Sequence, residues 1–202
     1  MKLFLASALE QVKNLFIEKF WNIDKQKIGF ISNPADLDRE WDIEPRWVSD
    51  DRKMLESLWW EIYDIDIREI KDAQLFEIVS KLDFLYVSGW NTRYFKMLAD
   101  SSWFQKVVNE LILKWSVKYI STSAWSCIMG TSIKYMDPGD FQIEEWYGIV
   151  NSMILPHRWS EHFKQEYEDT MPKIYNDNQN IITLTDNQAL FVDDKWMIIL
   201  WK

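Results

Sequence analysis

The sequence predicts an α/β protein with a mostly parallel sheet that helices cover on both faces. Short apolar runs typical of strands alternate with segments whose apolar residues recur at helical spacing, as in residues 2–7 and 8–20. The alternation continues to about residue 123, with no internal repeat and no low-complexity linker. Strands that alternate with helices form βαβ units, whose right-handed crossovers build a parallel sheet. A chain of 202 residues can bury one sizeable core, so we expect a single domain over residues 1–202.

Each element follows from its own pattern, in chain order. The expected strands of the first part are residues 2–7, 27–35, 61–67, 84–89 and 117–123. The helices expected between them are residues 8–20, 50–58, 72–82, 91–101 and 104–114, with a polar connection at 36–50. The C-terminal part changes character, with strands expected at 148–157, 180–185, 189–194 and 197–201 and one long helix at 160–176. Ligands bind at the carboxyl ends of strands in such sheets, so we expect the site at the sharp turns after 84–89 and 117–123.

Composition and charge exclude several classes of partner. The formal net charge is -9 with a pI near 4.8, whereas nucleic acid or an anionic membrane surface requires a basic face. No apolar run approaches the roughly 18 residues of a membrane span. Residues 1–11 carry charged and polar groups too early for a signal peptide, so we interpret them as the start of a core strand. The single cysteine, Cys127, excludes an internal disulfide and fits a reducing, cytoplasmic compartment.

Tryptophan is unusually frequent, with 13 residues against only 5 glycines, whereas glycine normally makes up about 7% of a chain. Several of the tryptophans stand where a chain commonly turns through glycine, just past a helix end or between a strand and a helix. These are Trp21, Trp59, Trp90, Trp103, Trp115 and Trp125. We hypothesise that many of them occupy positions that the source organism fills with glycine through a reassigned codon. The alternative is a genuinely tryptophan-rich protein with core or interface aromatics, and Trp60 and Trp146 look like ordinary tryptophans.

The stretch YISTSAWSCIMG, residues 119–130, indicates a strand, a sharp turn and a helix with Ser123 at the turn. This is the arrangement of a nucleophile elbow, which needs small residues two positions before and two positions after the serine. Ser121 fits the first requirement, but Trp125 does not fit the second. Cys127 is an alternative nucleophile, although its place one helical turn later predicts a buried side chain.

A serine hydroxyl needs a neighbouring base, and the chain has only two histidines. His157 ends the expected strand 148–157, which would place it at the same sheet edge as Ser123. His162 follows five residues later, but no cysteine or acidic residue completes a metal-binding pattern, so we expect no metal. Asp137 and Asp140 could orient the base, or could simply form turns.

Stabilising an oxyanion requires two backbone donors. The N–H of Ala124, directly after the expected nucleophile, is one candidate. The second is the N–H of Gly89 or Trp90, in the other sharp turn.

Four segments together resemble the peptidase E (α-aspartyl dipeptidase) family, which includes the cyanophycinases. They are YVSGWNTRYF, YISTSAWSCIMG, ILPHRWSEHF and TDNQALFVDD, and the resemblance extends over essentially the whole chain. Family members carry a GGGNT-like turn and an SAG elbow, so Trp90 and Trp125 fall on family glycines. The resemblance implies a three-layer αβα sandwich like that of class I glutamine amidotransferases, a flavodoxin-like fold, but with serine as nucleophile.

The resemblance also implies the roles of individual residues. Ser123 matches the nucleophile, His157 the base and Asp137 the third member, with Asp140 as the alternative because the spacing from the serine is one residue short. The backbone N–H groups of Trp90 and Ala124 match the oxyanion donors. If both tryptophans are genuine, Trp125 should crowd the elbow and Trp90 the oxyanion turn.

The same resemblance implies hydrolysis of short peptides with an N-terminal aspartate, without a cofactor. Gly89, Asn91 and Arg158 are candidate substrate contacts, and Arg93 is a further candidate. We expect no nucleic-acid or membrane partner, and a monomer or a homodimer. The alternatives are hydrolysis of cyanophycin-like aspartyl bonds, and a non-catalytic amidotransferase-like domain that acts in binding or regulation.

Overall fold

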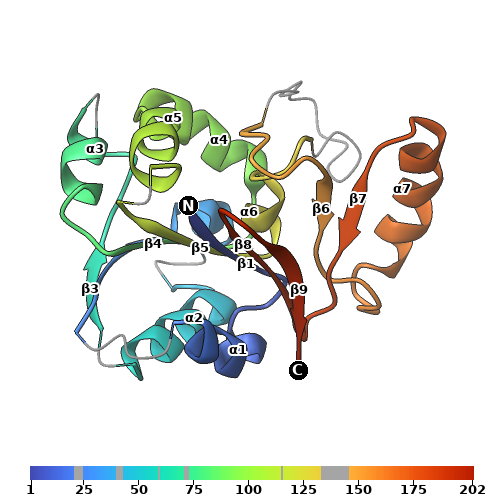
Figure 1. Ribbon diagram of the computed structural model, residues 1–202, viewed down its shortest axis with the longest axis horizontal. Coiled ribbons are helices and arrows are strands. Elements are labelled where there is room, and N and C mark those ends of the chain that lie inside the picture. Colours follow the sequence, from blue (N-terminus) through green and yellow to red (C-terminus); the bar gives the residue numbers. More distant parts are fainter. Residues whose placement is uncertain (21–24, 40–42, 59, 71–72, 115, 133–145) are drawn as a thin grey trace.

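The computed structural model describes the chain except residues 21–24, 40–42, 59, 71–72, 115 and 133–145 (Figure 1). Its centre is a seven-stranded sheet with the order β3-β2-β4-β5-β1-β8-β9. The strands are β1 (Lys2–Ala6), β2 (Lys27–Ile31), β3 (Glu61–Asp64), β4 (Phe84–Val87), β5 (Lys118–Thr122), β8 (Gln188–Asp193) and β9 (Met197–Trp201). Strands β1 to β5 pair in parallel, and β8 and β9 are antiparallel additions at one edge. The sheet is therefore mostly parallel, as the sequence predicts.

Helices cover both faces of this sheet and give three layers (Figure 1). Alternate side chains of β1 enter two separate cores, Leu3 and Leu5 on one face and Phe4 and Ala6 on the other, because successive residues of a strand point to opposite faces. The first core also receives side chains of α3 (Gln74–Val79), α4 (Thr92–Ser101), α5 (Phe104–Val107) and α6 (Ala124–Cys127). The second receives those of α1 (Lys13–Lys19) and α2 (Arg46–Glu56). This arrangement confirms the predicted three-layer α/β fold.

The C-terminal part forms a small unit beside the main sheet. Strands β6 (Met153–Leu155) and β7 (Ile181–Thr183) pair in parallel in a separate two-stranded sheet, next to α7 (Lys164–Asn176). Met153 and Leu155 pack with α7 in a core of their own, whereas Ile154 faces the main core. The strand expected at 148–157 is consequently shorter than predicted and is not part of the main sheet. Helix α7 likewise begins at Lys164 rather than at residue 160.

Both ends of the connection expected at residues 36–50 are helical, although its composition is polar. It includes the end of a 3-10 helix, Asn33–Asp38, and the beginning of α2 at Arg46. The helix expected at 104–114 starts as α5 and continues as a π-helical turn, Val108–Ile112. The first of these differences reaches the site, because Trp47 at the beginning of α2 stacks on Trp90 after β4.

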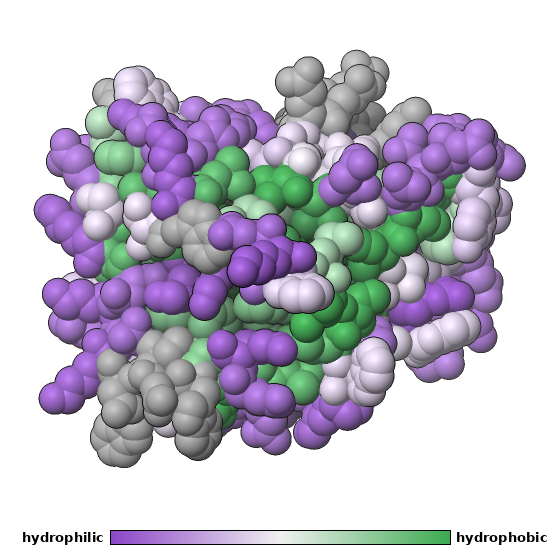
Figure 2. Space-filling view, viewed as in Figure 1, coloured by the Kyte–Doolittle hydropathy of each residue, from purple (hydrophilic) through white to green (hydrophobic). Residues whose placement is uncertain are grey.

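Hydrophobic side chains also reach the surface in a band across the middle of one face (Figure 2). Strand β9 forms the edge of the sheet, and its residues Met197, Ile198 and Ile199 are all partly exposed. The adjacent hydrophilic side chains border this band (Figure 2).

Candidate active site

Ser123 occupies the turn between β5 and α6 in a conformation that few residues other than glycine adopt. Its φ is 55° and its ψ is -130°. Its N–H lies 3.0 Å from the carbonyl oxygens of both Ala6 and Ser7, at the end of neighbouring strand β1. These contacts fix the strained turn from outside, as happens in a nucleophile elbow.

The turn after β4 approaches Ser123 closely at Gly89. A Cβ atom on residue 89 would lie 2.6 Å from the Cβ of Ser123, closer than real Cβ contacts allow. Glycine at this position therefore lets the two turns meet at the sheet edge. Gly89, which the sequence suggests as a substrate contact, lies directly against the serine.

His157 lies beside Ser123, although it comes from the small unit rather than from the main sheet. Its Nε2 is 2.7 Å from the Oγ of Ser123. The imidazole stacks on Phe163, with ring centroids 4.6 Å apart, and the backbone of His157 has a φ of 63°. With the ring proton on Nδ1, Nε2 is free to accept the proton of the serine hydroxyl.

The carboxylate at the other ring nitrogen is Asp186, which the sequence analysis does not single out. Its Oδ1 is 2.7 Å from Nδ1 of His157. The hydrogen bond with His157 is the largest cause of a lowered pKa of Asp186, and it outweighs the opposing effect of burial. Asp137 and Asp140, the sequence candidates for this role, lie outside the described residues. Asp186 stands in the TDNQALFVDD segment, directly after an expected strand, and this position was the available signal.

Ser7, the residue after β1, joins the histidine to the carboxylate. Its Oγ donates to Oδ1 of Asp186 over 2.8 Å and accepts the backbone N–H of His157 over 2.8 Å. Ser7 is fully buried. One side chain therefore positions two members of the Ser123–His157–Asp186 chain.

Two cavities of about 200 Å³ and about 500 Å³ flank Ser123. Both are lined by Trp90, Ser123, His157 and Phe163. The larger cavity is also lined by acidic residues, which are Glu10, Asp50 and Asp51. The smaller is also lined by Asn91, Thr92, Ala124 and Glu166 among others. Within the described part of the chain, no lysine or arginine lines either cavity.

Of the predicted substrate contacts, Asn91 lines a cavity beside Ser123 and Arg158 does not. Asn91 lines the smaller cavity, where its Oδ1 also accepts the N–H of Tyr94 and caps α4. The guanidinium of Arg158 instead lies 3.8 Å from the ring centroid of Trp159, and Arg158 lines a separate cavity. Arg158 is thus not brought to the serine.

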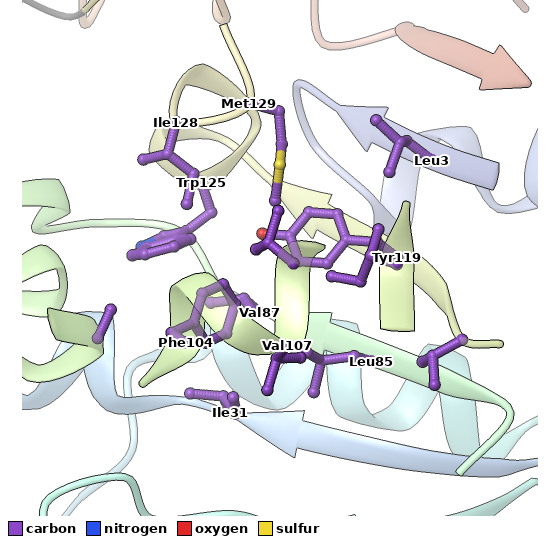
Figure 3. Close-up of a cluster of buried hydrophobic side chains, with 14 of the residues drawn as sticks. Leu3, Ile31, Leu85, Val87, Phe104, Val107, Tyr119, Trp125, Ile128 and Met129 are labelled. Carbon is purple, nitrogen blue, oxygen red and sulfur yellow. The ribbon is translucent and has the colours of Figure 1, made fainter. Parts of the chain in front are cut away.

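The two tryptophans expected to obstruct the site behave differently. Trp90 lines both cavities and stacks on Trp47, with ring centroids 5.0 Å apart. Trp125 is fully buried in the core against Phe95 and Phe104 and lines neither cavity beside Ser123. Figure 3 shows it with Phe104 in this cluster. The expectation that Trp125 crowds the site is therefore wrong, and its cost appears instead as an indole N–H without a hydrogen-bond partner.

Cys127, the alternative nucleophile, is almost completely buried. Burial raises the pKa of its thiol well above the usual range, which disfavours the reactive thiolate. In the described residues, no group of three or more His, Cys, Asp or Glu side chains is arranged to hold a metal ion. None of the helices seen there is long and apolar enough to cross a bilayer.

Comparison with known proteins identifies the family to which this chain belongs. The model of peptidase family S51 matches residues 3–200. The chain belongs to peptidase family S51. The sequence resemblance to peptidase E is thereby confirmed at the level of the family.

Relatives of this S51 chain are similar over nearly their whole length. An uncharacterized peptidase of Listeria monocytogenes is 25% identical over 97% of this chain and 96% of its own. An uncharacterized peptidase of Pasteurella multocida is 26% identical over 98% of this chain and 96% of its own. These matches agree with the family model in making the S51 chain a peptidase.

Solved structures show the same fold. A crystal structure of a candidate peptidase E from Listeria monocytogenes superimposes with a TM-score of 0.85 at 24% identity, covering all of the S51 chain and 98% of that one. A peptidase from an acI-B1 Actinobacterium gives a TM-score of 0.70 at 19% identity, covering all of this chain and 87% of its own. At these identities the likeness supports the flavodoxin-like fold.

Proposed function

We propose that this S51 peptidase is a serine-type enzyme that hydrolyses short peptides with an N-terminal aspartate. The observation that carries the proposal is the continuous chain from Ser123 Oγ through His157 to Asp186, with 2.7 Å at each contact. The geometry favours Asp186, rather than the expected Asp137, as the carboxylate that orients the base.

The proposed reaction is acyl transfer. The Oγ of Ser123 attacks the peptide carbonyl carbon, and Nε2 of His157 takes the hydroxyl proton. The N–H of residue 90, in the turn after β4, and the N–H of residue 124, at the start of α6, hold the oxyanion. His157 then gives its proton to the leaving amine, and the acyl-enzyme forms. Water hydrolyses the ester in a second round that returns the proton to Ser123.

Asp186 keeps the histidine in the tautomer that this reaction needs. Its lowered pKa keeps the carboxylate ionised at neutral pH, so it stabilises the imidazolium that forms when His157 takes the proton. Ser7 supports the same state, because its hydroxyl donates to Asp186 while accepting the His157 backbone N–H.

The charges around the serine support a substrate with a free N-terminus. The larger cavity, with its acidic residues Glu10 and Asp50, suits the ammonium group of a peptide N-terminus. The beginning of α4, with Asn91 and Thr92 in the smaller cavity, favours an anion through its N-terminal dipole. The preference for aspartate rests on the family resemblance, since no cation of the described chain lines these cavities.

Four dipeptides that share a C-terminal leucine test the proposal. Asp-Leu carries both groups, Asn-Leu lacks the carboxylate, Ala-Leu lacks the polar side chain, and N-acetyl-Asp-Leu lacks the ammonium. We expect hydrolysis of Asp-Leu to be fastest, and loss of the N-terminal ammonium to cost the most. The Ser123→Ala variant serves as the control and should lose activity with every substrate.

The outcomes separate the alternatives. Cleavage of a β-aspartyl-arginine dipeptide in preference to Asp-Leu would support the cyanophycin-like alternative. A serine-directed organophosphonate that labels the wild type but not Ser123→Ala would establish the nucleophile. Folded protein that neither reacts with this reagent nor cleaves any of the peptides would support the non-catalytic alternative.

A further inference from the structure

Tryptophan occupies an unexpected share of the backbone positions that favour glycine. Seven described residues other than glycine have a positive φ, and three of them are Trp90, Trp103 and Trp159. Tryptophan makes up 13 of 202 residues, so chance would place fewer than one at seven positions. The positive φ of Ser123 and His157 accompanies the contact between their side chains in the site. No such contact accounts for the positive φ of the three tryptophans.

Trp90 has the least favourable backbone of the three. Its φ of 116° lies beyond the left-handed helical region at about +50 to +70°, which is itself costly for a bulky residue. Trp103, with φ 57° and ψ 33°, stands just past the end of α4 at the place where helices commonly end on a left-handed glycine. Trp159, with φ 70°, turns the chain two residues after His157.

The side chains of these tryptophans do not explain their presence. All three are exposed, with 39% of the surface of Trp90, 46% of Trp103 and 76% of Trp159 accessible. Trp60 is the contrasting case, since it is only 7% exposed and packs on Phe16 and Phe84. Trp60 also has no positive φ. The structure thus distinguishes a core tryptophan from tryptophans at glycine-like turns.

Glycine itself seldom fills such turns here. Among the described glycines, only Gly148 has a positive φ. Gly29, Gly89 and Gly130 stand instead where a Cβ would collide with neighbouring atoms.

From these observations we infer that residues 90, 103 and 159 are glycines in the protein that the source organism makes. Trp21, Trp59 and Trp115 of the sequence hypothesis lie outside the described residues, and Trp125 has no positive φ, so the inference does not include them.

Glycine at position 90 has a consequence for the cleft. Trp90 lines both cavities beside Ser123 and its ring stacks on Trp47. We expect that removal of this side chain joins the two cavities in one cleft that passes over the serine. A peptide can then place residues on both sides of the scissile bond. This consequence rests on the proposed function.

The backbone part of the inference is tested by stability. At each of positions 90, 103 and 159 the tryptophan form is compared with its glycine and alanine variants by thermal unfolding. Glycine relieves positive-φ strain whereas alanine keeps a Cβ, so we expect each glycine variant to melt about 2–8 °C above the tryptophan form and above the alanine variant. Trp60→Gly and Trp60→Ala are the matched controls, and there glycine should be the less stable of the two.

Melting temperatures that are highest with tryptophan at positions 90, 103 and 159 would overturn the inference. A direct readout is the mass of tryptic peptides from the protein isolated from its source organism. Glycine masses at these positions support the inference, and tryptophan masses overturn it.

The cleft is tested separately with Asp-Leu. We expect Trp90→Gly to raise kcat/KM at least about 10-fold over the tryptophan form, with Trp90→Ala in between. An unchanged kcat/KM in an active enzyme would overturn the joined cleft. If no variant cleaves peptides, the proposed function fails, while the melting temperatures and peptide masses still decide the identity of the three residues.

Discussion

Asp186 and Asp51 both lie near Ser123 and His157, but their surroundings shift their pKa values in opposite directions. Asp186 faces the His157 ring, and this hydrogen bond lowers its pKa. Asp51, in α2, accepts the hydroxyl of Tyr86 over 2.5 Å and the N–H of Glu10 over 3.2 Å, yet burial raises its pKa to about 7. A partner that can become a cation keeps a carboxylate ionised, whereas two neutral donors do not offset the loss of water. Of these two carboxylates, Asp186 is therefore the one suited to stabilise an imidazolium.

The largest expected difference between the two acids is catalytic. Asp186→Asn should lower kcat for peptide hydrolysis by about 10⁴-fold, because the histidine loses the group that fixes its tautomer. Asp51→Asn should lower it by far less, since Asp51 makes its hydrogen bonds with Tyr86 and Glu10 rather than with His157. Steady-state kinetics of both variants measure the difference. A 10⁴-fold loss in Asp137→Asn with none in Asp186→Asn would transfer the role to Asp137.

The second expected difference concerns the free energy of unfolding, which should increase when the Asp51 carboxylate is removed. The pKa of Asp51 is about 7 in the folded protein against an ordinary value of 3.8, so the folded protein binds more protons than the unfolded chain between these two pH values. Stability attributable to Asp51 therefore falls as the pH rises from about 4 to about 7. Asp51→Asn should remove this loss and be about 2–4 kcal/mol more stable than the wild type at pH 8. Urea unfolding at pH 5 and pH 8 measures it, and parallel pH dependences of the two proteins would contradict it.

A smaller effect is expected from the side chain that holds Asp186 in place. Ser7→Ala removes the hydrogen bond to the carboxylate, which should lower kcat about 10-fold and shift the pH profile of kcat. Ser7→Thr should restore much of the loss, because the hydroxyl returns. Ser126→Ala is the control: Ser126 is equally buried and bonds to the neighbouring Ala6 carbonyl. A similar kcat and pH profile in the Ser7→Ala and Ser126→Ala variants would show that Ser7 contributes packing and does not position Asp186.

The smallest effect is the acid sensitivity that Asp186 itself contributes. Because its folded pKa is lowered, its stabilisation is present above the unfolded value of about 3.9 and is lost as the pH falls through the folded pKa. Asp186 is partly exposed, so solvent screening keeps this contribution small. Thermal unfolding below pH 4 should therefore show a slightly shallower decline in Asp186→Asn than in the wild type. An identical fall of the melting temperature in the two proteins would contradict the inference that Asp186 and Asp51 affect stability in opposite ways.

The sequence predicts the elements of the main sheet and the Ser123 turn because local patterns encode both. Apolar alternation marks the strands, and the turn follows directly from the end of β5. Asp186 is not predicted because its position after an expected strand is a weak signal alone, and its place beside His157 depends on β8 docking antiparallel beside β1. Trp125 is misjudged for a related reason: its distance from Ser123 in sequence is fixed, but its direction depends on how α6 packs on the core.

The pairing of β1 with β8 also has a consequence for the timing of synthesis. Ser7 and Asp186 are 179 residues apart, and the hydrogen bond between them forms only after β8 has joined the sheet. The Ser123–His157–Asp186 arrangement therefore cannot form until residue 186 and strand β8 have left the ribosome. During translation the chain carries its serine and histidine without the carboxylate. Hydrolytic activity should thus appear only after β8 has been synthesised and has paired with β1.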